Sequence, residues 1–351
     1  MLAIDGHLDL AMNALILDRD YKASIDTIRQ HEAGMTEKGR GVNTVSLPEL
    51  RKAEIAVCFA TVIARVQQPD SPLKGYRTHE TAYSQSMGQL AWYRELQRQG
   101  EVRLLHDRAE LDAHMVEWEA DPENTPIGII LSMEGADPVV EPAQIHHWWD
   151  EGLRVISLAH YGPSKYAHGT STPGPLTDAG REILDEMSGT NMILDVSHLN
   201  DDSFWEAVER FKGPLLASHS NCRELVPGDR QFTDDMIRHL IERDAVIGAV
   251  MDSWMLYPGY VRGETDRSVT SLSDVVDNID HVCQLAGNAS HAAIGTDLDG
   301  GYGTEQCPKD LDTIADIQKM TGMLADRGYS QADIENIFHG NWLRLMRRVW
   351  G

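Results

Sequence analysis

Histidine and carboxylate side chains follow short apolar runs at several separate places in the sequence. They are His7, Asp9, Glu134, His160, His198, His219 and Asp297. A carboxylate that directly follows an apolar run is costly to bury unless a cation or a hydrogen-bond donor contacts it. Imidazole and carboxylate groups without thiolate suit Zn²⁺, and Mn²⁺, Co²⁺ and Fe²⁺ are the alternatives. The residue types therefore predict a metal centre that activates water.

The spacing of these residues supports one shared centre. His7 and Asp9 are two residues apart, as are Asp297 and Asp299, so on a strand each pair points to one side. A single histidine at a strand end is more often structural than a ligand. Histidine makes up only 15 of the 351 residues, however, and its repeated occurrence at strand ends is hard to reach by chance. Four ligands and one shared carboxylate are enough for two ions about 3.5–4 Å apart.

The elements that must position these side chains are short apolar runs, which predict strands. The predicted strands are residues 2–9, 54–62, 126–134, 153–158, 191–195, 214–218, 245–250 and 292–297. Longer amphipathic stretches lie between them and predict helices. These are residues 78–99, 142–151, 177–189, 201–212, 234–243 and 271–286, and further helices are expected near 311–327 and 330–350.

This alternation predicts an α/β fold of the (β/α)8-barrel type, with extra C-terminal helices and residues 1–351 in a single domain. An open doubly wound sheet is the alternative, but no glycine-rich fingerprint follows the first strand. In a barrel the predicted ligands gather at the carboxyl-terminal rim, where barrel enzymes build their sites. The long spacers 64–77, 160–175 and 251–269 are expected to shape the pocket.

Composition excludes several classes of protein. The net charge of −24, from 31 basic and 55 acidic residues, argues against nucleic-acid and anionic-membrane partners. Cys58, Cys222, Cys283 and Cys307 form no CxxC pair, which argues against a disulfide scaffold or a cysteine zinc knuckle. No secretion signal or apolar run of about 18 residues is present, so we expect a cytoplasmic protein.

The motifs as a set resemble those of the membrane (renal) dipeptidase family, peptidase family M19 of the amidohydrolase superfamily. The matching segments are Asp5-Gly-His-Leu-Asp9, Met133-Glu-Gly135, Ser157-Leu-Ala-His160, Leu194-Asp-Val-Ser-His198, Ala217-Ser-His-Ser-Asn-Cys-Arg223, Ile294-Gly-Thr-Asp-Leu-Asp-Gly300 and Phe338-His-Gly-Asn-Trp-Leu-Arg344. Together they cover nearly the whole chain in the expected order.

The resemblance implies two zinc ions per subunit. It assigns His7 and Asp9 to one zinc, His198 and His219 to the other, and Glu134 to both as a bridge. The implied reaction is hydrolysis of a dipeptide, L,D-dipeptides included, by a hydroxide held between the metals. The family tendency also implies a homodimer.

The resemblance further implies roles for three residues around the metals. His160 would contact the scissile carbonyl oxygen, Arg230 would bind the substrate carboxylate, and Asp297 would shuttle protons. The sequence departs from the family pattern at Leu8 and Tyr161, where asparagine is usual, and in residues 251–260. These departures concern specificity more than metal chemistry.

Two other functions stay open on the sequence. The same barrel and metals could hydrolyse another small amide, an N-acyl amino acid or a lactone. A barrel that keeps its metals only for binding would lack the proton shuttle, and Asp297 is present. His168, Trp254 and Tyr257 are candidates for the pocket wall, although loop packing is favoured for each. Cys222 is expected to be a small buried hydrophobe.

Overall fold

The computed structural model describes residues 1–68 and 74–351, so part of the predicted spacer 64–77 lies outside the described residues. All eight predicted strands are present, and each is buried along its whole length, as a sheet covered on both faces requires. They are β1 (Ala3–Leu8), β2 (Ile55–Val62), β4 (Ile127–Met133), β5 (Val155–Ser157), β6 (Ile193–Asp195), β7 (Leu215–Leu216), β8 (Ile247–Ala249) and β9 (Ala292–Ile294).

The strands run parallel and curl into a barrel. One sheet has the order β1-β2-β4-β5-β6-β7, and β8 pairs with β9. Two seams join these sheets: the Gly248 N–H donates to the Ala217 carbonyl at 2.8 Å, and the Asp297 N–H donates to the His7 carbonyl at 3.2 Å. The predicted (β/α)8-barrel type of fold is confirmed.

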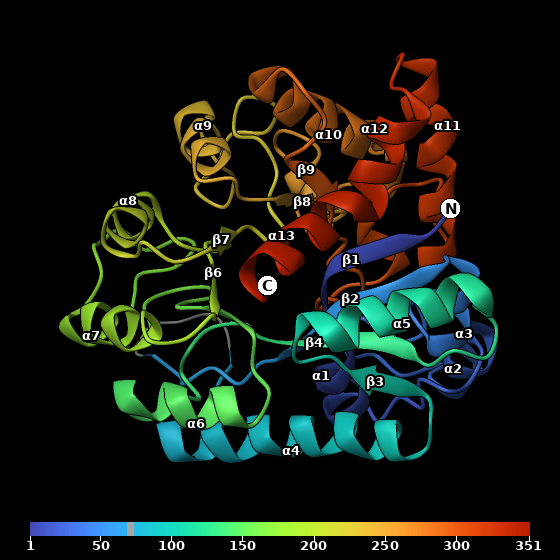
Figure 1. Cartoon of the computed structure of the whole chain (residues 1–351). Helices are drawn as coiled ribbons and strands as arrows, with labels where there is room; N and C mark the ends of the chain where they lie inside the picture. The colour runs from blue at the N-terminus through green and yellow to red at the C-terminus, as the bar shows by residue number, and fades with distance from the viewer. Residues whose placement is uncertain (69–73) are drawn as a thin grey trace.

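Helices surround the strands (Figure 1). The six helices predicted between strands correspond to α4 (His79–Arg98), α6 (Ile145–Asp150), α7 (Asp178–Met187), α8 (Asp201–Arg210), α9 (Asp234–Glu242) and α10 (Leu272–Ala286). Several begin at a side chain that accepts a backbone N–H of the first turn, as Thr78, Thr177, Asn200 and Thr233 do. Short 3-10 turns precede α6 at Pro142–Gln144 and lie in the later loops at Ser253–Met255, Arg267–Val269 and Thr304–Gln306.

The structure contains further elements that were not specifically predicted. They are β3 (Val102–Leu104), which pairs with β4, and helices α1 (Leu10–Ile16), α2 (Ile25–His31), α3 (Leu47–Lys52) and α5 (Arg108–Ala120). The first three helices have six or seven residues each, too short for a clear helical repeat. In α5 the buried Leu111, Met115 and Trp118 have helical spacing, but the apolar Val116 is exposed, which reduces the contrast between the two faces.

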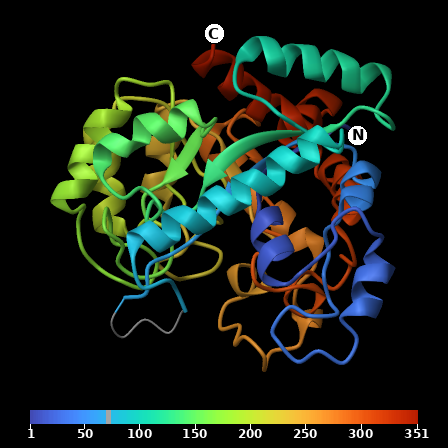
Figure 2. The same cartoon turned by 90° about the horizontal axis from the view of Figure 1, so that it is seen from below.

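The predicted C-terminal helices are present and close one end of the barrel. They comprise a 3-10 turn (Ile314–Gln318), α11 (Lys319–Asp326), α12 (Gln331–Glu335), a π-helical turn (Asn336–Gly340) and α13 (Asn341–Val349). The Asn341 side-chain amide donates to the Ala292 carbonyl at 2.8 Å, at the start of β9. Figure 2 shows the C-terminus at one end of the molecule and long loops at the other. The carboxyl ends of the strands thus remain open toward those loops.

Below the rim the barrel is narrow around the Ser218 carbonyl. A Cβ atom added at Gly248 or Gly295 would lie 2.1 or 1.8 Å from that oxygen. Glycine at both positions therefore lets β8 and β9 approach the segment that carries His219. Among the described residues, no helix has the length and apolar character needed to cross a membrane.

Candidate metal centre

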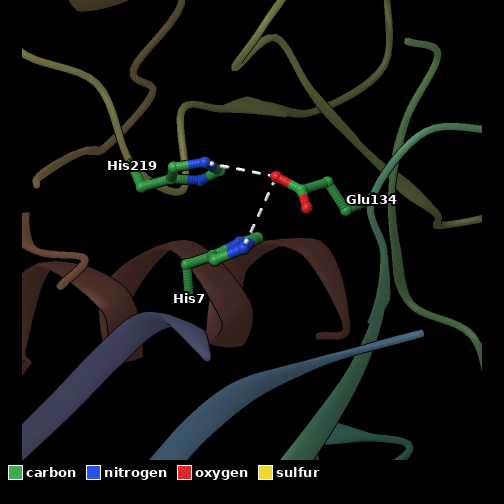
Figure 3. A group of neighbouring side chains, drawn as sticks. All are labelled: His7, Glu134 and His219. Atoms are coloured by element: carbon green, nitrogen blue, oxygen red, sulfur yellow. Dashed lines mark ion pairs between the residues drawn. The ribbon is translucent and has the colours of Figure 1, made fainter. Parts of the chain in front are cut away.

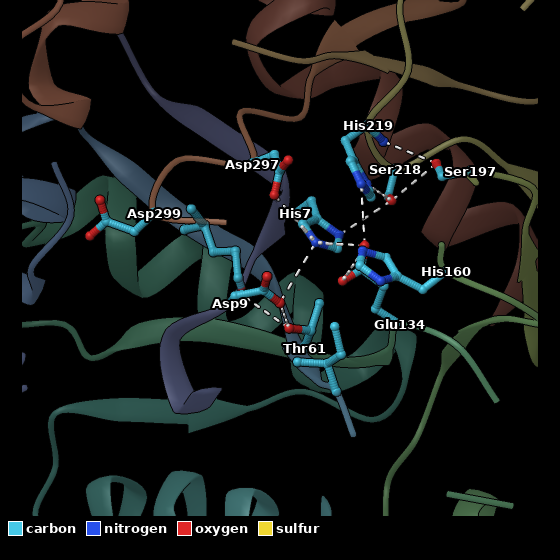
Figure 4. Close-up of polar contacts among 12 residues, drawn as sticks. His7, Asp9, Thr61, Glu134, His160, Ser197, Ser218, His219, Asp297 and Asp299 are labelled. Carbon is cyan, nitrogen blue, oxygen red and sulfur yellow. Dashed lines mark hydrogen bonds and ion pairs between the residues drawn. The ribbon is translucent and has the colours of Figure 1, made fainter. Parts of the chain in front are cut away.

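The carboxyl ends of four barrel strands supply the predicted metal ligands. His7 lies in β1, and Asp9 follows it as the residue before α1. Glu134 directly follows β4, and His198 and His219 each lie three residues beyond their strands, β6 and β7. All five side chains are buried, and Figure 4 shows four of them, Asp9 among them, converging on one region. The structure therefore brings the predicted set together.

Glu134 lies at the middle of this cluster. Its Oε1 atom is 3.2 Å from His198 Nε2, 3.3 Å from His219 Nε2 and 3.6 Å from His7 Nε2. Its other oxygen, Oε2, lies 3.6 Å from His160 Nε2. Figure 3 shows His7 and His219 directed at the same carboxylate. A carboxylate in this position could be shared between two cations.

His7 connects this group to a second one. Its Nε2 atom lies 3.8 Å from Asp9 Oδ1 and 3.9 Å from Asp297 Oδ1. The potential ligand sets are His7–Glu134–His219, Glu134–His160–His198 and His7–Asp9–Asp297. Because the sets overlap at His7 and Glu134, the residues form one continuous centre rather than separate clusters.

The positions of the ligand atoms suit a bound metal ion better than they suit hydrogen bonds among the ligands themselves. His7 Nε2 is buried and has no hydrogen-bond partner among the described residues. The Nε2 atoms of His198 and His219 lie only 3.1 Å apart, and both face Glu134. An unpaired imidazole nitrogen beside a buried carboxylate is costly, and a divalent cation would meet both groups at once.

Burial sets the charge state of the cluster. It lowers the pKa of His7, His160, His198 and His219 well below the usual value for histidine, which leaves neutral rings with a free lone pair. Burial, reinforced by Glu134, raises the pKa of Asp9 to about 8 and that of Asp297 well above its usual range. The neutral imidazoles can bind a cation directly, whereas Asp9 and Asp297 must release protons when a cation binds.

Hydroxyl groups orient two of the histidines. The Thr170 hydroxyl lies 3.1 Å from His198 Nδ1, and the Ser218 hydroxyl lies 2.7 Å from His219 Nδ1. Ser218 also donates to Asp195 Oδ2 at 2.5 Å. Since the Nδ1 atoms are engaged this way, the Nε2 atoms are held toward the centre.

Sequence reasoning missed these supporting residues, although part of the signal was present. Ser218 directly precedes His219, and Asp195 closes a predicted strand, so both could have been suspected. Thr170 comes from the loop after β5 and carries no such sign. Thr61 on β2 donates to the Asp9 carboxylate and orients that ligand.

The expectation that Asp297 and Asp299 share one face is wrong. Strand β9 ends at Ile294, and the two aspartates have left-handed φ values of +55° and +62°, so the alternation of a strand no longer applies. Asp299 turns away and accepts the Thr44 backbone N–H at 2.7 Å and the Thr44 hydroxyl at 2.8 Å. Only Asp297 faces the metal centre.

A cavity of about 260 Å³ opens over the centre, and Arg230 forms part of its wall beside His160 and Asp297. The Arg230 guanidinium is buried and donates to the Ser220 hydroxyl at 3.0 Å and to the His219 carbonyl at 2.8 Å. These two bonds leave three of its five N–H groups for a ligand.

The remaining pocket candidates fall into two groups. Trp254 lines the cavity, whereas His168 packs in its loop with Nδ1 2.8 Å from the Pro175 carbonyl, and Tyr257 is exposed. The four cysteines are buried and unpaired, as expected for Cys222, whose thiol pKa burial raises.

Two of the three departures from the family pattern, Leu8 and Tyr161, have well-defined contacts. Leu8 belongs to the apolar core, so Thr61 rather than residue 8 supports the ligand Asp9. The Tyr161 ring packs edge-on against His160 and His198 at centroid distances of 4.7 and 5.1 Å. Its hydroxyl accepts a bond from Arg262 at 3.1 Å, which joins the loop 251–269 to the pocket.

Comparison with known proteins agrees with this geometry. The chain is 28% identical over 353 residues to dipeptidase aclJ of Aspergillus oryzae, covering 98% of this chain and 77% of that one. A solved dipeptidase AC of family M19 aligns with a TM-score of 0.82 at 22% identity, over 100% of this chain and 99% of that chain.

A second solved structure is a metallopeptidase from Rhodobacter sphaeroides, liganded with a phosphinate mimic of the dipeptide L-Ala-D-Ala. It aligns with a TM-score of 0.81 at 21% identity, over 100% of this chain and 99% of that chain. Because these two solved structures are only 22% and 21% identical to the chain, their similarity establishes the fold alone. The family model described as membrane dipeptidase (peptidase family M19) matches residues 1–350. The prediction of a metallo-dipeptidase enzyme is thereby confirmed, and the chain belongs to the membrane dipeptidase family, peptidase family M19.

Proposed function

We propose that the protein is a zinc-dependent dipeptidase with two zinc ions per subunit, and that L,D-dipeptides are among its substrates. The observation that carries the proposal is the convergence of His7, His198 and His219 on Glu134, within 3.2–3.6 Å, at the floor of a cavity. The L-Ala-D-Ala mimic bound by the Rhodobacter sphaeroides enzyme supports the L,D-dipeptides.

The ligands divide between two sites that share Glu134. His7 and Asp9 would hold one zinc, and His198 and His219 would hold the other. Bound divalent cations supply Lewis acidity, which acidifies water and polarises a carbonyl group. The absence of thiolate from the set agrees with a catalytic rather than a structural zinc site.

Asp297 would move the protons of the reaction. Its Oδ1 atom lies 3.9 Å from His7 Nε2, at the edge of the centre. In the ionised form it would accept the proton of the attacking water, and in the protonated form it would return one to the leaving amine. Its position beside the ligands suits this transfer.

His160 and Arg230 would bind the substrate around the scissile bond. A neutral His160 donates from Nε2 to the carbonyl oxygen as that oxygen gains negative charge, and losing one such donor typically costs about 3–4 kcal/mol. Arg230 binds the terminal carboxylate with its free N–H groups. Recognition of that carboxylate near the scissile bond restricts the substrate to short peptides.

A substrate panel with the zinc-loaded protein tests the proposal. We expect turnover of L,L- and L,D-dipeptides, no comparable turnover of N-acyl amino acids or lactones, and two zinc ions per chain by metal analysis. Failure to hydrolyse any dipeptide would contradict the proposed activity. Preferred hydrolysis of an N-acyl amino acid would favour the alternative amidohydrolase reaction.

A further inference from the structure

Arg65 is a cation in the cavity wall for which the proposed reaction has no role. It follows β2 by three residues and lines the cavity together with Asp9 and Glu134. Its backbone is fixed, because the Tyr76 N–H donates to the Arg65 carbonyl at 2.8 Å and the Val66 N–H donates to Asp137 at 2.7 Å. The base of the side chain is therefore held in place.

The Arg65 guanidinium itself has no hydrogen bond or ion pair to any residue in 1–68 or 74–351, although the residue is half-buried. The other arginines of the cavity differ in this respect. Arg230 bonds to Ser220 and the His219 carbonyl, and Arg262 bonds to Tyr161 and lies 3.5 Å from Asp252. Arg65 thus keeps all its N–H groups for a ligand.

The two arginines serve different sides of the metal centre. Arg65 follows β2, whereas Arg230 is bonded to Ser220 and the His219 carbonyl, after β7. Strands β2 and β7 are four steps apart in either direction around the barrel, so the two arginines come from opposite sides of it. A substrate that spans the centre from Arg230 must extend toward Asp9 and Arg65.

A second cavity adjoins the first on the Arg65 side. It measures about 290 Å³ and shares Met12, Ile63 and Arg65 with the cavity over the metals. Lys74 lies in its wall, and no carboxylate does among the described residues. Its apolar walls and two cations suit a short aliphatic chain that ends in an anion.

We propose that Arg65 binds a carboxylate on the side chain of the N-terminal residue, so that the enzyme prefers dipeptides that begin with glutamate or aspartate. The inference rests on the proposed dipeptidase function and specifies its substrate class. With cations bound by Asp9 and Glu134, the nearest protein anions are engaged, and Arg65 requires a counter-charge from the substrate.

Turnover of five dipeptides by the zinc-loaded enzyme tests this: Glu-Ala, Asp-Ala, Ala-Ala, Lys-Ala and Ala-Glu. A hydrogen-bonded charge pair corresponds to roughly 10–100-fold in kcat/KM, so we expect Glu-Ala to exceed Ala-Ala by about that factor, mainly through KM. Lys-Ala should be the poorest substrate. Equal kcat/KM for Glu-Ala and Ala-Ala, or a preference for Ala-Glu, would overturn the assignment.

Arg65→Met keeps the length of the side chain and removes the charge. The ratio of kcat/KM between Glu-Ala and Ala-Ala should fall toward one, and Arg65→Lys should restore part of it. Arg98→Met, on the exposed face of α4, is the matched control and should leave the ratio intact. Zinc content is measured for each variant.

The outcomes separate this inference from the proposed function. Hydrolysis of Ala-Ala without any advantage for Glu-Ala removes only the role of Arg65. An equal loss for both substrates in Arg65→Met would reduce Arg65 to a positioning residue for Asp9 and Glu134. Failure of every dipeptide would remove the proposed function as well. If Arg65→Met does not fold, the ratio of kcat/KM between Glu-Ala and Ala-Ala in the wild-type enzyme and in Arg65→Lys still tests the role of Arg65.

Discussion

Asp297 and Asp299 show how strongly local backbone geometry decides the role of a carboxylate. The two residues are two positions apart, yet Asp297 faces the ligands while Asp299 ties the Thr44 backbone to the loop after β9. A left-handed φ at both positions turns the side chains in different directions. Chemistry at this edge therefore depends on one of two neighbouring aspartates.

Replacing Asp297 by asparagine should remove proton transfer and keep the shape of the site. We expect kcat to fall by about 10²–10⁴-fold, which is the usual contribution of a general acid–base group. Zinc content should stay near the wild-type value because the assigned ligands remain. Steady-state kinetics with Ala-Ala and metal analysis measure both quantities.

Asp299→Asn is the control for this substitution. It should lower thermal stability, since Asp299 accepts bonds from the Thr44 backbone and hydroxyl in the interior. Its effect on kcat should be much smaller than that of Asp297→Asn. Wild-type turnover in Asp297→Asn would contradict the proton-transfer role.

The sequence predicted the candidate ligands because they combine residue type with position after an apolar run. His7, His198 and Glu134 stand out in this way. Thr170 and Arg65 could not be predicted, because each comes from a loop without a periodic pattern and reaches the site only through the folded path of the chain. The roles assigned to His160 and Arg230 came from the family resemblance and remain predictions.

At the scale of elements, Ser218 connects three strands beneath the candidate metal centre. Its hydroxyl donates to Asp195 at the end of β6, lies 2.7 Å from His219 Nδ1 beyond β7, and lies 3.4 Å from His7 Nδ1 in β1. The orientation of ligands from separate strands thus depends on one small side chain.

Ser218→Ala should therefore weaken metal binding without removing a ligand. Loss of such an orienting contact typically costs 10–100-fold in metal affinity, and Asp195 loses a hydrogen-bond donor. Competition with a chelator of known affinity measures the change. Ser86→Ala is the control, because the buried Ser86 hydroxyl on α4 has no partner among the described residues; an equal loss in both variants would refute the orienting role.

The close approach of β7, β8 and β9 leads to a prediction on stability. In Gly295→Ala the new Cβ would lie 1.8 Å from the Ser218 carbonyl, so the backbone must shift. We expect a loss of about 1–3 kcal/mol in the free energy of unfolding, and zinc binding should weaken because Ser218 moves. Urea denaturation provides the measurement.

Gly322→Ala is the matched control in α11, where an added Cβ meets nothing within 4 Å. Alanine in a helix interior should stabilise the protein by about 0.5–1 kcal/mol. A Gly295→Ala variant as stable as wild type would show that the barrel at this point is wider than the structure indicates.

The sequence predicted the barrel strands well because they are buried on both faces and read as unbroken apolar runs. Several of these runs form shorter strands than predicted, as at β7, where only Leu215–Leu216 pairs regularly and the candidate ligand His219 lies three residues beyond the strand. β3 was missed because three residues carry too little pattern. Its pairing with β4 depends on contacts between residues far apart in the sequence, which local patterns cannot predict.

For the whole molecule, one apolar core extends from β1 to the C-terminal helices. Trp342 of α13 shows this continuity, since it donates from the indole N–H to the Ile294 carbonyl at 2.9 Å and packs against Phe59. A core of this kind supports the prediction of a single domain. A homodimer, a cytoplasmic location and the absence of nucleic-acid or membrane partners remain predictions from composition and resemblance.

Removal of the metals should affect the whole molecule. A chelator should abolish turnover and zinc should restore it, and the melting temperature should fall on metal loss. A ligand that binds only the folded state stabilises it by about 2.7 kcal/mol when its free concentration is 100 times the Kd. Thermal denaturation with and without zinc measures this difference.

The size of that stabilisation should depend on pH in a defined direction. In the metal-free protein, burial and Glu134 raise the pKa of Asp9 to about 8, above its value of about 3.9 in the unfolded chain. The folded state then holds the proton more tightly, so this group favours folding below about pH 4 and loses that contribution as pH rises toward 8.

Zinc must displace the same proton from Asp9, so the affinity of the protein for zinc rises over the same pH range. The difference in melting temperature between zinc-loaded and metal-free protein should therefore grow from pH 5 to pH 8, and a difference that shrinks as pH rises would contradict the assignment of Asp9 as a ligand.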